Sequence, residues 1–315
     1  MKRPGKVLAG RFSRAERKRQ RKNIDLEDAS LTDQTRTRYY TALRKLIPSL
    51  TDIDSFDILD EKVCKWIRKM WKQGEPLLTI GDALSALHFF QPSTKRQIPH
   101  SWKLFATWRK VEIPARAPPL TAVLVRGISA LALDRKQLAL ATCLMLAFPA
   151  LLRTGEILAL RGSDIMLGPD HGLLRLELTK SGRRHAVSEA ISIHDEIVLT
   201  LLSSLLEMRK SQGCLEACLW DKSSQAFRQQ FRKLCHDFGL DHLQFRPYSL
   251  RRGGATAYFQ ATLSMEATLL RGRWESSRVA KLYIKDGLSF LPSLKTTQVT
   301  KQMLAKHHFI SPSKG

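Results

Sequence analysis

The sequence predicts a mainly helical protein with a small β-sheet, built from two helical parts. Apolar residues recur at helical spacing over most of the 315 residues, whereas the alternation typical of a strand is clearest at 173–178. A segment at 113–119 carries three prolines, which cannot lie inside a helix and favour an extended connection. This segment separates roughly 110 residues from roughly 195, so two domains are expected.

The charge balance points to a polyanionic partner. The chain has 52 lysines and arginines against 29 aspartates and glutamates, a formal net charge of +23. Such a charge favours nucleic acid, with a membrane surface as the rival. No run of about 18 apolar residues is present, so no membrane partner is expected. The N-terminus lacks the apolar core of a signal peptide, which predicts an intracellular protein, nuclear if its host is eukaryotic.

The five cysteines predict neither disulfides nor a metal site. Their number is odd and their spacing irregular, which argues against a disulfide framework. A zinc site would need a second closely spaced ligand pair, which does not follow Cys214 and Cys218; the remaining candidates are Cys235 and His236. We interpret the cysteines as free thiols, and we expect neither a metal nor another cofactor.

Residues 1–29 form a basic arm, with ten lysines or arginines among the first 24 residues. This composition predicts a disordered segment. A basic arm can bind phosphates or act as a nuclear import signal, and the sequence does not separate these roles.

Residues 30–112 are expected to form four helices. The first can be capped by Thr32 and ends at Pro48, the third spans 77–90, and the fourth lies around 102–108. In the second helix, apolar residues recur at i, i+3, i+4, i+7 and i+8 and define a buried face. Its opposite face carries five cations, which fit a DNA-facing surface: Lys62, Lys65, Arg68, Lys69 and Lys72.

The second part, 121–290, is expected to be helical with one β-hairpin, preceded by a linker at 113–120 and followed by a tail at 291–315. The expected elements are helices near 120–131 and 134–149, strands at 173–178 and 186–193 with a turn at 181–184, and helices near 195–209, 224–238, 249–259 and 276–285.

Arg153 lies in an apolar run and is followed three residues later by Glu156. Burying an arginine is costly unless it is paired or binds an anion. One interpretation is a structural ion pair at a helix surface. The other is an arginine held by a carboxylate and directed at a phosphate, whose oxygens match the planar guanidinium fork.

Three further motifs follow along the chain. They are Tyr248-Ser-Leu-Arg251, then Gly272 and Trp274 separated by one residue, then Tyr283 nine residues after the tryptophan. Each motif is weak alone, because Arg251 could be a surface charge, Trp274 a core residue and Tyr283 an ordinary aromatic residue of a helix. In this order, after the arginine–glutamate pair, they resemble the tyrosine recombinase, or phage integrase, family.

The resemblance covers about 120–290 and implies roles for the matching residues. Arg153 and Arg251 match the two arginines that neutralise the transition state, and Glu156 accompanies the first of them. Lys180, at the end of the first predicted strand, matches the lysine that protonates the leaving 5′-hydroxyl. Within the family, the Leu-Leu-Arg before the glutamate is most similar to Cre.

The remaining matches imply the reaction itself. Tyr283 matches the nucleophile, which forms a 3′-phosphotyrosine link that a 5′-hydroxyl reverses without ATP or metal. Trp274 stands where the family has His or Trp, and its indole N–H can donate to a phosphate oxygen. The resemblance further implies a core-binding domain at 30–112, a catalytic domain at 121–290, double-stranded DNA as the partner and a homotetramer on paired sites.

The tail is expected to act between subunits. In this family C-terminal helices dock on a neighbouring protomer, and a short helix with no obvious mate is predicted within 298–310. Its apolar residues are Val299, Met303, Leu304 and Phe309.

One departure from the family pattern is Tyr248, because the family usually has histidine three residues before the second arginine. Telomere resolvases are similar in having tyrosine there. Arg273, beside the tryptophan, is also unlike the family pattern and receives no role. Three functions follow: a site-specific recombinase or integrase of a mobile element, a DNA-binding protein on the same fold that has lost strand exchange, and a telomere-resolvase-like or topoisomerase-like nicking-closing enzyme.

Overall fold

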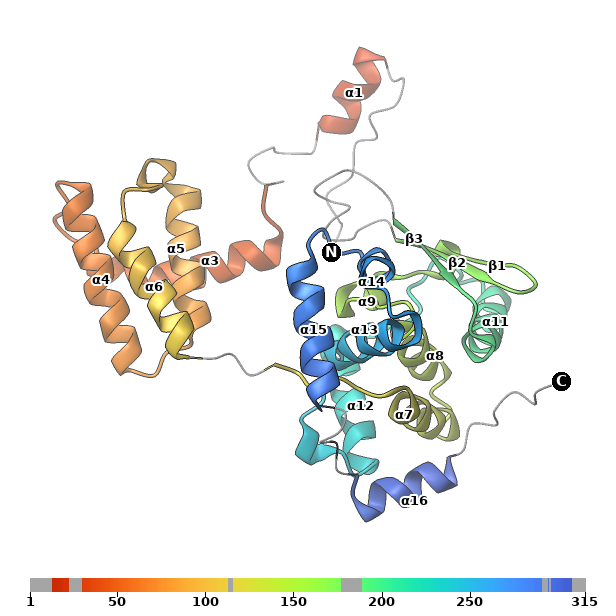
Figure 1. Ribbon diagram of the computed structural model, residues 1–315. Helices are drawn as coiled ribbons and strands as arrows, with labels where there is room; N and C mark the ends of the chain where they lie inside the picture. Colours follow the sequence, from red (N-terminus) through yellow and green to blue (C-terminus); the bar gives the residue numbers. More distant parts are fainter. Residues whose placement is uncertain are drawn as a thin grey trace. The chain divides into compact units, whose positions relative to one another are not determined.

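The computed structural model describes residues 13–22, 30–112, 116–176, 189–290, 294 and 296–307. The chain consists of two compact units, Met1–Ala115 and Arg116–Gly315, with the boundary inside the proline-rich segment. Helices dominate both units in the described ranges, and one three-stranded sheet lies in the second (Figure 1). The predicted fold class, mainly helical with a small sheet, is therefore confirmed.

The described part of the basic arm is helical, which corrects the expectation of disorder for these residues. Helix α1 spans Arg14–Arg21. The Ser13 side chain accepts a hydrogen bond from the backbone of Glu16, and the Glu16 carboxylate accepts one from the Ser13 N–H at 2.7 Å. This reciprocal cap, with basic residues in the last turn, favours a helix despite the density of positive charge.

The first unit is a small helical domain with its own apolar core. Short 3-10 turns containing Pro48 and Pro92 close its first and third helices. The core residues with no exposed surface include Leu46, Val63 and Ile80. The four helices are α3 (Asp33–Leu46), α4 (Phe56–Lys72), α5 (Leu77–Phe90) and α6 (Pro99–Val111).

A buried carboxylate joins two of these helices. Asp60 lies on α4 and is 3% exposed. Its oxygens accept hydrogen bonds from the backbone N–H groups of His100 at 2.9 Å and Ser101 at 2.8 Å, which begin α6. Burial raises the pKa of Asp60, but the hydrogen bonds from Ser101 and His100 outweigh burial and lower it below its ordinary value. Asp60 therefore caps α6 from a neighbouring helix.

The second unit builds a larger core around α8, which is apolar on all sides and buried along most of its length. The helices and strands of this unit are α7 (Ala122–Asp134), α8 (Leu138–Ala147), α9 (Thr154–Ala159), β1 (Ile165–Leu167), β2 (Gly172–Leu176), β3 (Glu189–Ile193), α11 (Glu196–Ser211), α12 (Ser224–Asp237), α13 (Tyr248–Thr262), α14 (Met265–Gly272), α15 (Ser277–Phe290) and α16 (Gln298–Lys306).

The sheet is antiparallel in the order β1-β2-β3. Along β2, Leu174 and Leu176 are buried while Arg175 is exposed, which is the alternation that predicted this strand. The sequence did not predict β1, because three residues are too few to show a period. The predicted turn at 181–184 lies outside the described residues.

Close backbone packing places α13 in the centre of the second unit. A Cβ atom on Gly253 would lie 1.8 Å from the Leu120 carbonyl oxygen, and one on Gly254 would lie 2.1 Å from that of Phe148. No side chain fits at either position, so α13 contacts both segments at backbone distance. This packing fixes where the two residues before Gly253 on α13 can lie.

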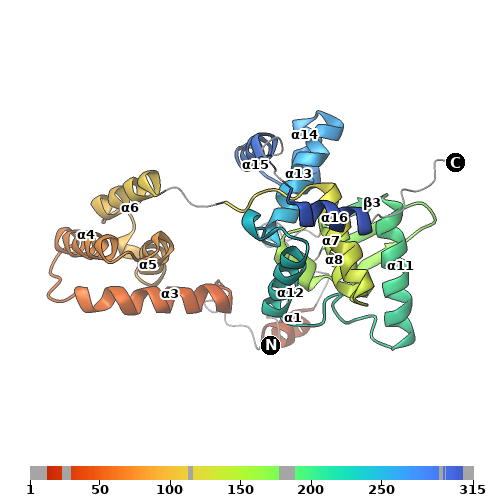
Figure 2. The same ribbon diagram turned by 90° about the horizontal axis from the view of Figure 1, so that it is seen from below.

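The tail helix α16 covers its own unit, which corrects the expectation that it has no mate in its own chain. Met303 and Leu304 pack against the apolar core, and the Thr300 hydroxyl donates to the Phe238 carbonyl oxygen at 3.1 Å. Figure 2 shows α16 beside α7. The predicted apolar residue Phe309 lies outside the described residues. No helix in the described ranges is long and apolar enough to cross a membrane.

We expect Asp60→Ala to weaken the first unit by about 2–4 kcal/mol, because two N–H groups at the start of α6 lose their acceptor. The pKa of Asp60 is depressed in the folded state, so its contribution is present above about pH 4 and lost as pH falls through the folded pKa. Hydrogen exchange of peptides from α4 and α6, measured against pH, tests this. Glu61→Ala, on the exposed side of α4, is the control; equal protection in both variants would contradict the prediction.

Candidate active site

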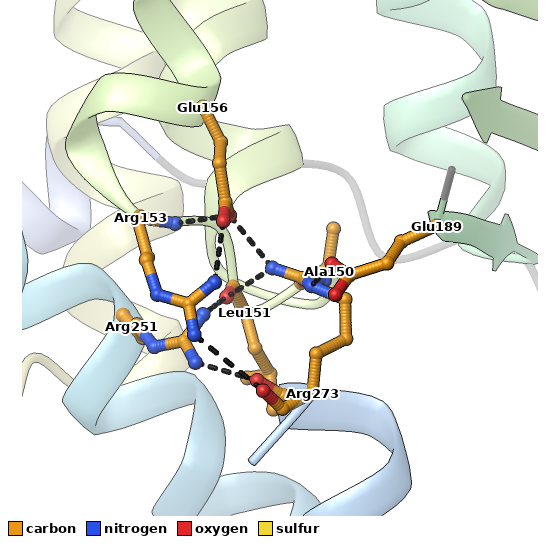
Figure 3. A network of polar contacts seen from close by, with 8 residues as sticks. Ala150, Leu151, Arg153, Glu156, Glu189, Arg251 and Arg273 are labelled. Carbon is orange, nitrogen blue, oxygen red and sulfur yellow. Dashed lines mark hydrogen bonds and ion pairs between the residues drawn. The ribbon is translucent and has the colours of Figure 1, made fainter. Parts of the chain in front are cut away.

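One buried carboxylate organises the predicted site. Glu156 lies in the first turn of α9 and is 8% exposed. It accepts hydrogen bonds from the backbone N–H of Arg153 at 2.8 Å and from the Arg153 guanidinium at 2.6 Å. The oxygen that accepts from the Arg153 backbone N–H, Oε2, also accepts from the Arg273 guanidinium at 2.7 Å. Figure 3 shows both guanidinium groups converging on this carboxylate.

The second predicted arginine, Arg251, is fully buried on α13. It donates to the carbonyl oxygens of Leu151 and Gly272, the latter at 2.5 Å (Figure 3). Leu151 has φ 47°, a left-handed conformation that is unfavourable for a residue with a bulky side chain. Strain of this kind persists where the surroundings impose it, and here it directs a carbonyl oxygen at a guanidinium group.

Arg273, which received no role in the sequence analysis, contacts both carboxylates of the site. It ends α14 in a left-handed conformation, with φ 55°. Its guanidinium contacts Glu156 and, at 3.1 Å, Glu189 at the start of β3. It also donates to the Ala150 and Leu151 carbonyl oxygens, at 3.2 and 3.3 Å. Since Glu156 is 117 residues away in sequence, no local pattern could have identified this pairing.

The site has an excess of positive charge. The guanidinium groups of Arg153, Arg251 and Arg273 lie around the carboxylates of Glu156 and Glu189 (Figure 3). Burial, and then the charges of the other two arginines, lower the pKa of Arg251 to about 10. Arg251 is therefore still protonated at neutral pH, and the cluster favours an anion.

Trp274 packs directly on this cluster. Its ring centroid lies 4.6 Å from the Arg251 guanidinium carbon, a cation–π arrangement. A Cβ atom on Gly272 would lie 1.8 Å from the tryptophan ring, so only glycine allows the ring this position. On its other side, the Trp274 ring lies 5.7 Å from that of Tyr283.

The two tyrosines of the site face each other. Tyr283, on α15, shares a short hydrogen bond between hydroxyl groups with Tyr248, at the start of α13. Their rings are 6.0 Å apart and meet edge to face. Burial and the bond to Tyr248 raise the pKa of Tyr283 above its ordinary value, while the charges of Arg251 and Arg252 act in the opposite direction.

The structure thus brings together six of the seven residues predicted for the site, and Lys180 lies outside the described residues. The six are Arg153, Glu156, Tyr248, Arg251, Trp274 and Tyr283. Sequence reasoning missed Arg273, Glu189 and Arg252, whose guanidinium carbon lies 5.3 Å from the Tyr283 ring centroid. The one signal for Arg252 is its position directly after Arg251 and before the run of small residues at 253–257.

A cleft with an excess of positive charge adjoins Tyr248. Its volume is about 460 Å³, and Thr154 and Tyr248 line it together with Asp241 and three arginines: Arg228, Arg232 and Arg246. Within the described ranges these three guanidinium groups form no ion pair with a carboxylate, unlike those of the buried cluster. A phosphate-bearing strand can therefore lie along this cleft next to Tyr248.

Comparison with known proteins identifies the fold. The family model described as the phage integrase family matches residues 124–287. The structure is similar to the Tn1549 transposon integrase in complex with transposon right end DNA, with a TM-score of 0.60 and 13% identity over 93% of this chain and 96% of that chain. No curated protein matches the sequence.

Two structures of lambda integrase also match. One is a dimer bound to a COC′ core site, with a TM-score of 0.55 and 17% identity over 89% of this chain and 83% of that chain. The other is a tetramer bound to a Holliday junction, with the same TM-score and identity over 82% of this chain and 73% of that chain. At such identities the likeness shows a shared fold.

We expect Glu156→Gln to destabilise the second unit by about 3 kcal/mol or more, because breaking a buried ion pair leaves guanidinium charge without compensation. Urea unfolding monitored by hydrogen exchange in α9 and α14 measures this. The matched control is Glu216→Gln, whose carboxylate is 77% exposed and pairs with Arg161 at 4.0 Å; it should change stability by no more than about 1 kcal/mol. Equal effects would show that Glu156 does not hold the cluster.

Proposed function

Since this chain belongs to the phage integrase family, we propose that it is a site-specific recombinase that cuts and rejoins double-stranded DNA through a covalent bond at Tyr283. The observation that carries this proposal is the contact series from Arg251 to Trp274 to Tyr283. It puts one phenol hydroxyl beside a buried cluster of excess positive charge, and a phosphodiester needs both a nucleophile and charge neutralisation to be cleaved.

The proposed cleavage begins with a DNA phosphate bound by Arg153 and Arg251. Their planar guanidinium groups match the phosphate oxygens and neutralise the charge that grows in the transition state. The Tyr283 oxygen attacks phosphorus and transfers its proton to water, and the bond from phosphorus to the 5′-oxygen breaks. A 3′-phosphotyrosine remains, and attack by a 5′-hydroxyl reverses the step. In this proposal Lys180 protonates the leaving 5′-oxygen and Trp274 donates its indole N–H to the phosphate.

Tyr248 has a specific place in this scheme. Its hydroxyl bonds that of Tyr283. A phosphate entering the site would offer both hydroxyl groups a new partner, so Tyr248 can act as a neutral hydrogen-bonding group where most of the family has histidine. A tyrosine cannot readily carry positive charge, which leaves charge neutralisation to the arginines.

The DNA partner is supported by several features. The net charge of +23 favours a polyanion, and the cleft beside Tyr248 presents three arginines that pair with no carboxylate in the part of the chain that the structure describes. The lambda and Tn1549 integrases with the same fold are seen bound to DNA, in one case as a tetramer. We therefore propose that the protein acts as a homotetramer on paired sites and that the first unit is a core-binding domain. We also propose that it acts in the nucleus if its host is eukaryotic.

A second candidate function is a DNA-binding protein of this fold that has lost strand exchange. The observation that favours it is the bond between Tyr248 and Tyr283, because that bond and burial make the Tyr283 hydroxyl a poorer nucleophile. A DNA substrate with a nick beside the cut site separates the two functions, since an active enzyme is trapped on it covalently whereas a binding protein is not.

We expect Tyr283→Phe to bind DNA like the parent and to form no covalent adduct, because the phenol oxygen is the proposed nucleophile. Denaturing gel electrophoresis of the nicked-substrate reaction measures the adduct. Tyr258→Phe is the control, since Tyr258 lies on α13 and contacts Arg271 instead of the arginine cluster at the site. An adduct formed by the Tyr283→Phe protein would require another nucleophile.

We expect Tyr248→Phe to slow single-turnover cleavage by roughly 10- to 1000-fold, the range for losing one transition-state hydrogen bond. Tyr248→His should keep or raise the rate and add a dependence on pH between about 5 and 8, as the imidazole titrates. Rates on the nicked substrate measured across this pH range test both. A Tyr248→Phe protein as fast as the parent would reduce Tyr248 to a packing role.

A further inference from the structure

Arg251 and Arg252 are neighbours on α13 but face different parts of the unit. Successive residues of a helix point about 100° apart, so adjacent side chains cannot share one partner. Arg251 reaches Leu151 and Gly272, whereas Arg252 reaches α15 and the segment before α7. Arg252 is 3% exposed, so its charge needs compensation as much as that of Arg251.

The compensation comes from the helix that carries Tyr283. Arg252 donates to the Asp286 carboxylate at 2.7 Å and to the Ala117 carbonyl oxygen. Asp286 follows Tyr283 by three residues, so both side chains lie on one face of α15. The same carboxylate accepts from Arg116 at 3.1 Å, which ties the start of the second unit to this helix.

Arg252 also contacts the tyrosine itself. Its guanidinium carbon lies 5.3 Å from the Tyr283 ring centroid, within the range of a cation–π interaction. One residue therefore holds Tyr283 in two ways, through its ring and through the carboxylate one turn away. The positive charge of Arg252 acts on the pKa of Tyr283 in the same direction as that of Arg251, towards the phenolate.

The packing of α15 on α13 does not by itself fix how far α15 is turned about its own axis. A Cβ atom on Gly287 would lie 2.0 Å from the Thr256 hydroxyl oxygen, so the two helices are in close contact there. The Thr256 hydroxyl in turn donates to the Tyr283 carbonyl oxygen at 3.4 Å. A close contact at glycine sets the separation of two helices, but a helix can still turn about its own axis unless a side chain on another face is held.

We propose that Arg252 is a positioning residue for Tyr283, which fixes the rotation of α15 through Asp286 and holds the tyrosine ring towards the phosphate site. This inference rests on the proposed function, because it assigns Arg252 a part in presenting the nucleophile. Arg252 itself does not contact the DNA in this scheme and acts only through Tyr283.

The test compares DNA affinity with the rate of single-turnover cleavage of the nicked substrate. Arg252→Met should cleave roughly 10- to 100-fold more slowly while its Kd changes less than about 3-fold, because the phosphate ligands remain in place. Arg252→Lys keeps the charge and should recover most of the rate. Asp286→Asn, at a partly exposed position that tolerates substitution better than Arg252, should slow cleavage roughly 3- to 10-fold at unchanged Kd.

The matched control is Arg135→Met, which removes another arginine–aspartate pair, to Asp237 at 2.6 Å on α12. It should leave both the rate and the affinity unchanged. Cleavage by Arg252→Met at the parental rate, loss of rate only in proportion to loss of affinity, or equal slowing in the control would overturn the inference. If the parent protein forms no covalent adduct at all, the proposed function fails and this inference fails with it.

Discussion

The buried carboxylate of Glu156 is the interaction on which the candidate site depends. Three guanidinium groups lie together in the second unit, and an uncompensated buried charge costs several kcal/mol even after the protein relaxes. Glu156 contacts two of them, Glu189 adds a second negative charge, and carbonyl oxygens from two segments, 150–151 and Gly272, accept further hydrogen bonds from them. The two carboxylates do not neutralise all three guanidinium groups, and the remaining positive charge makes the cluster suited to a phosphate.

The two segments that supply these carbonyl oxygens each contain a residue with an unfavourable backbone conformation. Leu151 and Arg273 both lie in the left-handed region, which costs of order 1 kcal/mol or more for residues with a side chain. Arg251 bridges the two strained segments by donating to Leu151 and to Gly272, the residue before Arg273. The glycines of α13 and the glycine before Arg273 let backbone and ring atoms approach closely enough for these bonds.

The two phenol groups of the site are paired with each other. The Tyr248 hydroxyl bonds that of Tyr283, and burial together with this bond raises the pKa of Tyr283. The charges of Arg251 and Arg252 act on the pKa of Tyr283 in the opposite direction. In the proposed reaction a bound phosphate would compete for the two hydroxyl groups, and this would couple the reactivity of Tyr283 to occupation of the site.

The sequence by itself determined the helical fold class, the proline-rich boundary and the order of the site motifs, because periodicity, proline geometry and residue spacing are local properties. The helix over 77–90 was predicted with the same bounds that α5 has in the structure. Short elements such as β1 and α14 were missed, since they are too short to show a period. Only the tertiary structure decided the partner of Arg273, the facing hydroxyl groups of Tyr248 and Tyr283, and the packing of α16 on its own unit. Each of these contacts joins residues far apart in sequence, and their meeting depends on how whole helices pack.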